Sequence, residues 1–280
     1  MTTITASRPT TTNRRRQSHV VGDAVTMLRR NLLRVIRYPG LSLFTILGPV
    51  VVLLLSVFVF GGTLGAGLPG VDPADGRAGY LAYVVPGILL ITIAGTAAGA
   101  AITVAMDMTE GITARFRTMS ISRAAVMAGH VLGNTIQSII AVALVLGVSV
   151  LIGFRPTASP VEWLELAGLM VLISFAISWL GVAMGMQSKT VETASNLPLI
   201  LTVLPLLGSG FVPTASMPAG LEWFAENQPF TPFIESVRGL LLGTPLGWNP
   251  ALAVGWSIVI AVAGYVWSMA LYERKSVRGA

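Results

Sequence analysis

The sequence predicts an all-α integral membrane protein with six transmembrane helices. Of its 280 residues, 54% are hydrophobic and only 11% are charged, whereas a soluble domain carries about 25% charged residues. The apolar residues are gathered into continuous runs of roughly 20 residues, the length that a helix needs to cross the hydrocarbon of a bilayer. These runs do not alternate between polar and apolar residues, so they do not fit the strands of a membrane β-barrel.

Six runs qualify as membrane spans. They cover residues about 41–60, 80–106, 131–154, 166–186, 194–213 and 249–272. Pro198 and Pro205 interrupt the fifth run, which is tolerable because neighbouring helices can satisfy the backbone carbonyls that proline leaves free. No acidic or basic residue lies in the interior of a run. This weighs against a proton-coupled carrier and favours energy supplied from outside the chain.

Small and polar residues inside the spans are interpreted as packing residues. Gly95–Ala101 and Gly181–Gly185 are rich in glycine and alanine, which let two helices approach closely, either within the chain or between two copies of it. Ser174 and Ser178 lie one helical turn apart and are explained better by helix packing than by nucleophilic catalysis. Aromatic residues near the span ends, Tyr83 among them, are interpreted as anchors at the membrane interface.

The placement of arginine and lysine predicts the orientation. If the N-terminus is cytoplasmic, the inside segments hold fifteen of the eighteen basic residues and the outside segments hold only Arg77, Arg155 and Arg238. Such an excess of positive charge is typical of cytoplasmic loops. We therefore expect a multi-pass protein of the bacterial cell membrane with both termini inside. The net charge of +6 is explained by this topology and gives no reason to expect nucleic-acid binding.

The residues before the first span divide into two parts. Residues 1–19 are polar and are predicted to be a disordered cytoplasmic arm, ahead of one transmembrane domain at 20–280. Val21–Arg37 is predicted to be an amphipathic interfacial helix on the inner leaflet, with its apolar stripe in the acyl boundary. Its head-group-facing arginines are Arg29, Arg30, Arg34 and Arg37. This helix either anchors the protein only or also contacts a cytoplasmic partner.

The segment between the second and third spans is predicted to hold a short amphipathic cytoplasmic helix. Asp107 and Glu110 are acidic and favour a new helix start, and Phe116 lies on an apolar side with Ile112 and Met119. Ser120–Ser122 is expected to cap a further helix that begins at Arg123. A solvated loop without a partner is the alternative.

Two short helices are predicted between the fifth and sixth spans, at about 218–227 and 233–242, with Pro229 and Pro232 between them. Glu235 and Arg238 are spaced for an ion pair along the second helix. A plain extracellular loop is the alternative.

No motif for catalysis or nucleotide binding occurs in the sequence. There is no Gly-x-x-x-x-Gly-Lys-Ser/Thr loop, no His-Glu-x-x-His and no Gly-x-Ser-x-Gly, so the chain is not expected to bind ATP or to act as an enzyme. It has no cysteine, which excludes disulfides and thiolate metal sites. Its two histidines, His19 and His130, are far apart in the sequence and are not expected to form a metal site.

Two stretches resemble the ABC-2 type permeases, and most closely their daunorubicin-resistance subfamily of drug and lipid exporters. The first is Glu110-Gly111, Arg115-Phe116-Arg117 and Ser120-Ile121-Ser122-Arg123, which is similar to the family's cytoplasmic loop, although many members have Pro where this chain has Ser120. The second is Asn227-Gln228-Pro229, Thr231-Pro232 and Arg238-Gly239-Leu240, which resembles the segment between the last two spans. The resemblance covers roughly 20–274.

The resemblance implies an export function and its partners. It implies a dimer, expected to be a homodimer, that works with two copies of a separate ABC ATPase, which would bind ATP and Mg²⁺. The substrate would be a hydrophobic or amphipathic drug, antibiotic or lipid. The implied ATPase-coupling residues are Glu110, Gly111, Arg115, Phe116, Arg117 and Arg123. The implied outer gate, two helices that re-enter the outer leaflet, includes Asn227, Pro229, Pro232, Glu235 and Arg238. The alternatives are a lipid or glycan exporter of the same class, a passive channel or carrier without an ATPase, and a structural membrane protein.

Overall fold

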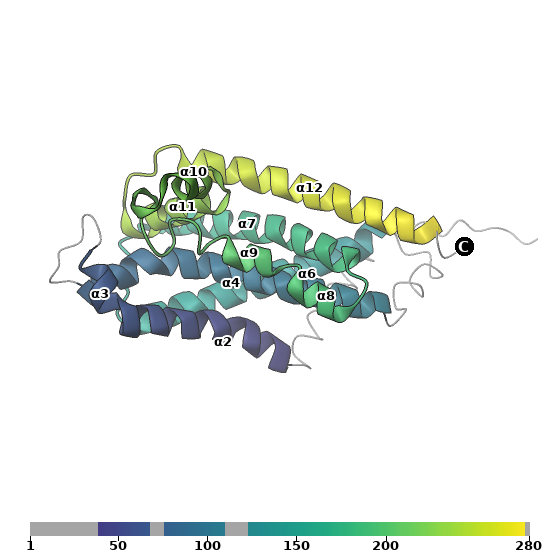
Figure 1. The fold of residues 1–280 in the computed structure, drawn as a ribbon, viewed down its shortest axis with the longest axis horizontal. Coiled ribbons are helices and arrows are strands. Elements are labelled where there is room, and N and C mark those ends of the chain that lie inside the picture. The colour runs from purple at the N-terminus through teal and green to yellow at the C-terminus, as the bar shows by residue number, and fades with distance from the viewer. Residues whose placement is uncertain (1–38, 68–75, 110–122, 278–280) are drawn as a thin grey trace, which may run out of the picture.

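A computed structural model describes residues 39–67, 76–109 and 123–277, with side chains described over 47–67, 76–109 and 126–272. These residues form an elongated bundle of helices (Figure 1). Within the described residues, five helical stretches are long and apolar enough to cross a membrane. They are Leu47–Gly65, Gly76–Thr109, Val126–Leu151, Pro160–Gln187 and Asn249–Tyr272. They coincide with five of the six predicted spans, and the predicted N-terminal interfacial helix lies outside the described residues.

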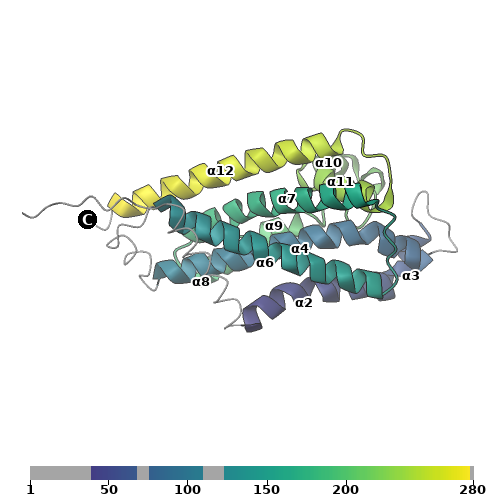
Figure 2. The same ribbon diagram turned by 180° about the vertical axis from the view of Figure 1, so that it is seen from behind.

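The long helices are joined into a bundle around α4 (Gly76–Thr109) and α7 (Pro160–Gln187). α4 packs against α6 (Arg123–Leu151), and α7 packs against α4, α6 and α12 (Asn249–Val277). α2 (Pro39–Leu55) continues through a π-helical turn at Ser56–Phe60 into α3 (Gly61–Gly65) and lies beside α4. In both views α2 and α12 form opposite sides of the bundle (Figures 1 and 2).

The fifth predicted span is broken. α8 (Val191–Asn196) and α9 (Leu199–Val203) are short helices, and turns continue from α9 to a 3₁₀ turn at Thr214–Ser216. Pro198 lies in the break between the two helices and Pro205 follows α9, as expected of a residue that lacks a backbone N–H donor. The broken segment still carries the chain from one end of the bundle to the other (Figure 1).

Side-chain caps fix the ends of two helices. Ser159 and Glu162 form a reciprocal capping box at the start of α7, and Pro160 occupies its first turn. At α8, the Thr190 hydroxyl accepts from the backbone N–H of Thr193. The backbone N–H of Glu192 and the Thr190 hydroxyl lower the pKa of the Glu192 carboxyl, because both donate hydrogen bonds to its charged form.

The expected new helix at Asp107 does not form there. α4 runs without a break to Thr109, so Asp107 belongs to its last turn, where it is 2% exposed. The acidic residue is therefore buried in the bundle and does not cap a new helix. α6 is described from Arg123 onward, the residue at which the sequence predicts its start.

Small residues form the seam between α4 and α7, as the glycine pattern predicts. A methyl group added at Gly181 would lie 2.5 Å from the carbonyl oxygen of Ala97, and one added at Gly185 would overlap the carbonyl of Ala101. Both separations are far shorter than van der Waals contact, so only glycine permits this helix spacing. Gly95 is different, because a methyl group there would meet nothing within 4 Å.

Hydrogen bonds between side chains join α6 to α7 within the bundle. The Asn134 amide donates to the Ser178 hydroxyl at 2.8 Å, and the hydroxyls of Ser138 and Ser174 are 3.1 Å apart. All four residues are buried. Ser174 and Ser178 are therefore packing residues, as their spacing suggests, since they satisfy polar groups that could find no water at this depth.

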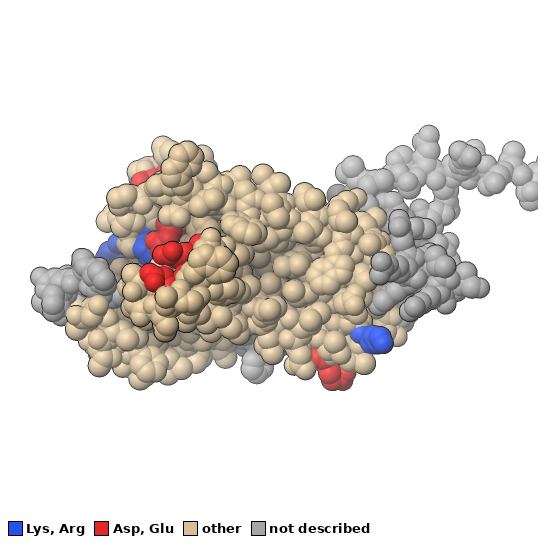
Figure 3. All heavy atoms as spheres, turned by 45° about the horizontal axis from the view of Figure 1, so that its top comes forward, with Lys and Arg blue, Asp and Glu red and all other residues tan. Residues whose placement is uncertain are grey.

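On the face shown in Figure 3, the charged side chains of the described residues lie near the two ends of the bundle. Arg77, Arg155, Glu162, Glu165, Glu222, Glu226, Glu235 and Arg238 lie towards the end with α3, α10 and α11, whereas Asp107, Lys189 and Glu192 lie towards the end with α8. We call these the α11 end and the α8 end. Large apolar side chains such as Val259, Val262 and Val266 of α12 are exposed between them, which fits a surface in contact with lipid.

Replacing Gly181 by Ala should lower the thermal stability of the detergent-purified protein. The added methyl group forces α4 and α7 apart, and overpacking of this kind costs about 1–3 kcal/mol. Gly147 is the matched control, because it is exposed and a methyl group there meets nothing within 4 Å. Gly147→Ala should be neutral or stabilising, since alanine is favoured over glycine in a helix by about 1 kcal/mol. Equal melting temperatures for the two variants would contradict the close seam.

A buried arginine at the α11 end as candidate functional site

Two short helices form the centre of the α11 end, as the sequence predicts. They are α10 (Ala219–Asn227) and α11 (Phe230–Leu242). Each is preceded by a proline, Pro218 and Pro229, whose fixed φ angle suits a helix start. α11 ends at Gly243, which has a left-handed φ of 67°, a conformation that glycine adopts without strain.

α11 is packed into the main hydrophobic core. Phe230, Phe233, Ile234, Val237 and Leu241 are each at most 1% exposed, and α11 packs against α4, α7 and α12. The backbone N–H of Thr157, in the connection between α6 and α7, donates to the carbonyl of Leu241 at 2.9 Å. An extracellular loop in free solution would not bury these side chains. The segment is therefore an integral part of the bundle.

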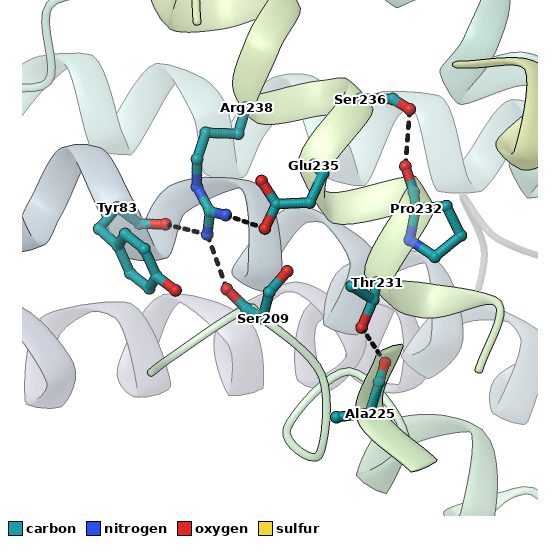
Figure 4. Close-up of polar contacts among 8 residues, drawn as sticks. All are labelled: Tyr83, Ser209, Ala225, Thr231, Pro232, Glu235, Ser236 and Arg238. Carbon is teal, nitrogen blue, oxygen red and sulfur yellow. Dashed lines mark hydrogen bonds and ion pairs between the residues drawn. The ribbon is translucent and has the colours of Figure 1, made fainter. Parts of the chain in front are cut away.

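Arg238 of α11 ties this helix to two other parts of the chain (Figure 4). Its Nη2 donates to the backbone carbonyl of Tyr83 in α4 at 3.1 Å and to that of Ser209 at 2.7 Å. Its Nη1 forms an ion pair with the carboxylate of Glu235, one turn earlier in α11. The guanidinium also lies over the Tyr83 ring, 4.0 Å from the ring centroid. We call these contacts the Arg238 tie.

The chemistry of arginine suits this position. Its planar guanidinium presents several N–H donors in a fixed fork and can stack on an aromatic face at the same time. The side chain of Arg238 is only 9% exposed, whereas that of Glu235 is 31% exposed, so the positive charge is buried more deeply than the negative one. A buried charge needs compensation by a partner and by hydrogen bonds, and the two carbonyls together with Glu235 provide it.

One further hydrogen bond links the turn at 204–213 to the junction between α10 and α11, and another links these two helices to each other. The Gln228 amide donates to the Leu204 carbonyl at 3.0 Å, and the Thr231 hydroxyl donates to the Ala225 carbonyl. A methyl group added at Gly208 would lie 2.6 Å from the Gln228 amide nitrogen, so the turn packs closely on these side chains. Within the described residues, Arg238 Nε, Ser209 Oγ and Gln228 Oε1 are buried without a hydrogen-bond partner.

Comparison with known proteins identifies the family. Residues 23–242 match the model of the ABC-2 type transporter family. The chain belongs to this family. It is 24% identical, over 258 residues, to the daunorubicin resistance ABC transporter permease protein DrrB1 of Streptomyces coeruleorubidus, covering 91% of this chain and 88% of the relative. It is 27% identical, over 206 residues, to the probable doxorubicin resistance ABC transporter permease protein DrrC of Mycobacterium tuberculosis (strain ATCC 25618 / H37Rv), covering 67% of this chain and 74% of the relative.

The ABC-2 permease brings together only part of the residue set expected at its gate. Glu235 and Arg238 pair as predicted. Asn227 stands apart, because it is exposed and its amide donates to the Trp223 carbonyl of its own helix at 2.8 Å. Pro229 and Pro232 shape the start of α11, where the Pro232 carbonyl accepts from the Ser236 hydroxyl. Re-entry of the two helices into a leaflet remains a prediction.

The structure adds Tyr83 and Ser209 to the site. From the sequence, Tyr83 is predicted to be an anchor at the membrane interface, and no pattern points to Ser209. No local signal connects either residue to Arg238, because Tyr83 lies 155 positions away and both contribute backbone carbonyls. The contact between the Tyr83 ring and the Arg238 guanidinium could not be predicted from sequence spacing either, since it depends on how α4 and α11 pack.

The predicted coupling residues cannot be placed in the same way. Glu110, Gly111 and Arg115–Arg117 lie outside the described residues, as do Arg29, Arg30, Arg34 and Arg37. Arg123 is the first described residue of α6, and its side chain is outside the described set. The assignment of these residues to an ATPase interface or to a lipid surface stays a prediction.

Arg238→Lys should loosen the turn at 204–213. Lysine keeps the charge but lacks the fork that reaches both carbonyls and Glu235. A hydrogen bond to a charged group contributes about 1.5–3 kcal/mol, so backbone hydrogen exchange of 204–213 in lipid nanodiscs should become roughly tenfold faster. Glu235→Gln should have a smaller effect, because glutamine still offers an acceptor to Arg238.

The control for this prediction is Glu226→Gln, which removes an exposed carboxylate from the neighbouring helix α10. Its exchange rates at 204–213 should match those of the unmodified permease. If Arg238→Lys also left the rates unchanged, the tie would not hold the turn.

Proposed function

We propose that this permease is the membrane subunit of an ATP-driven exporter that moves a hydrophobic or amphipathic molecule, such as a drug or antibiotic, out of a bacterial cell. The observation that carries the proposal is the similarity over 91% of the chain to a daunorubicin resistance permease. The family match at 23–242 includes both stretches on which the resemblance was first based.

The charge distribution supports an orientation with the α11 end outside. All three basic residues assigned to the outside, Arg77, Arg155 and Arg238, lie at this end, and Lys189 lies at the other. Positive charge favours the cytoplasmic face, and the predicted inside segments hold fifteen of the eighteen basic residues. In this orientation the segment 110–122 and the C-terminal end of α12 face the cytoplasm.

In this proposal, the partner ATPase acts on the permease at the α8 end. A separate ABC ATPase, present in two copies, binds ATP and Mg²⁺ and contacts the permease through Glu110, Gly111, Arg115–Arg117 and Arg123. Phe116 provides an apolar anchor for a groove on the ATPase, flanked by two arginines, a combination that often dominates the binding energy of an interface. α4 and α6 carry the resulting movement into the bundle, since they flank this segment directly.

The exit lies at the α11 end. Two copies of the permease, as a homodimer, enclose the substrate path, and α10 with α11 closes it on the outside. The buried face of α11 and the Arg238 tie support this assignment, because together they hold the 204–213 turn against α4. Opening the path requires the Arg238 contacts to be exchanged for others. The polar atoms left without a protein partner around the tie favour such a rearrangement, since burying them is costly.

Reconstitution with the ATPase tests the proposal. Permease and ATPase in proteoliposomes should move a fluorescent anthracycline when ATP is supplied on the ATPase side. Phe116→Ala should abolish most of this transport, because truncation of such an anchor costs about 2 kcal/mol or more and so weakens binding roughly thirtyfold. The measurements are transport, substrate-stimulated ATPase activity and co-purification of the ATPase.

Two controls make the result decisive. Trp223→Ala changes an exposed aromatic residue of α10 at the opposite end and should leave co-purification unchanged. A labelled phospholipid, offered in place of the anthracycline, separates drug export from lipid export. Transport that proceeds equally with and without ATP hydrolysis would contradict the proposal and favour a passive carrier.

A further inference from the structure

Asp107 and His130 form a buried polar contact at the α8 end. The Oδ2 atom of Asp107 lies 3.5 Å from Nε2 of His130, and the two side chains are 3% and 8% exposed. Asp107 belongs to the last turns of α4, two residues before Thr109, and His130 lies seven residues after Arg123 in α6. The contact therefore joins the two helices that flank the segment 110–122.

A charged carboxylate is energetically unfavourable at the position of Asp107. Burial removes the water that would stabilise its charge, and the C-terminal end of a helix disfavours an anion because the helix dipole is negative there. The imidazole of His130 offsets both effects and makes the contact an ion pair when it is protonated. A well-packed apolar pair would stabilise the bundle equally well. Stability alone therefore does not explain why two ionisable residues meet here.

The contact is embedded in a separate apolar cluster. The cluster joins four long helices at this end: Val104 of α4; Val126, Met127 and Val131 of α6; Trp179, Val182 and Met186 of α7; and Tyr272 of α12. Met108, which packs against this cluster, follows Asp107 in the sequence, and Val131 follows His130. Close packing transmits a displacement from one helix to the next, and a polar contact adds a directional link that apolar packing lacks.

We infer that Asp107 and His130 are positioning residues that clamp the ends of α4 and α6 together, so that a displacement of the segment 110–122 moves both helices as one unit. The inference rests on the proposed function, since it gives the energy-coupling step a physical link. Without the clamp, α4 and α6 lose this directional link, and ATP hydrolysis is less tightly coupled to opening of the α11 end.

The test measures substrate moved per ATP hydrolysed in proteoliposomes that contain permease and ATPase. Asp107→Asn and His130→Asn should each lower this ratio by about fivefold or more, the usual lower range of coupling between sites. The exchanged variant, Asp107→His with His130→Asp, should recover most of the ratio, because it restores a complementary pair. Ser138→Ala is the control, since it removes a buried hydroxyl contact between α6 and α7 and should keep the wild-type ratio.

The possible outcomes distinguish failure of the clamp from failure of the proposed function on which it rests. If the single variants lose thermal stability but keep the wild-type ratio of substrate moved per ATP hydrolysed, the clamp is wrong and the contact only stabilises the fold. An exchanged variant that folds but stays as uncoupled as the single variants would also overturn it. Wild-type proteoliposomes without any ATP-dependent transport would contradict the proposed function itself, and the clamp with it.

Discussion

Inside a bilayer no water is available to satisfy a polar group, and this constraint governs the architecture of the permease. A buried polar side chain is therefore costly unless it finds a partner within the bundle. Three sets of such partners occur at different heights in the described residues: the Arg238 tie at the α11 end, the serine and asparagine contacts between α6 and α7, and Asp107 with His130 at the α8 end. Buried hydroxyls elsewhere in the bundle, such as those of Thr92 and Ser149, donate to carbonyls of their own helices and join no two helices. At each of the three polar sets, directional polar contacts add to apolar packing and fix the relative position of the helices.

The seam between α4 and α7 gives the bundle its rigid centre. Gly181 and Gly185 allow the backbone of α7 to approach Ala97 and Ala101 of α4 more closely than any other residue would permit. Both end sites are attached to this centre through α4, since Tyr83 lies near its start and Asp107 near its end. A helix of 34 residues that is held along its middle provides a mechanical connection between the two ends. The flanking helices α2 and α12 pack less deeply and present apolar side chains outward.

Local patterns predicted much of this arrangement. Continuous apolar runs located five spans, prolines marked the short helices α10 and α11, and the three-residue spacing of Glu235 and Arg238 predicted their pairing. The interruption of the fifth run at Pro198 and Pro205 was also predicted, and it divides the run into short helices and turns; that this segment crosses the membrane stays a prediction. The partners of Arg238 could not be foreseen, since they are backbone carbonyls on distant segments. Asp107 was misassigned to a new helix, because its burial depends on α6 packing beside α4.

The proposed function requires that ATP bound by a partner ATPase moves the α8 end of the permease and opens the path at its α11 end. Electron–electron distance measurements on spin labels in the assembled transporter test it most directly. A label at Gly220 of α10, where an added side chain meets nothing within 4 Å, reports on the α11 end, and a label at the exposed Lys189 reports on the α8 end. In a complex with two permease copies, a non-hydrolysed ATP analogue should lengthen the distance between the two Gly220 labels and shorten that between the two Lys189 labels. Distances that stay unchanged at both positions, in a preparation active in transport, would contradict the account.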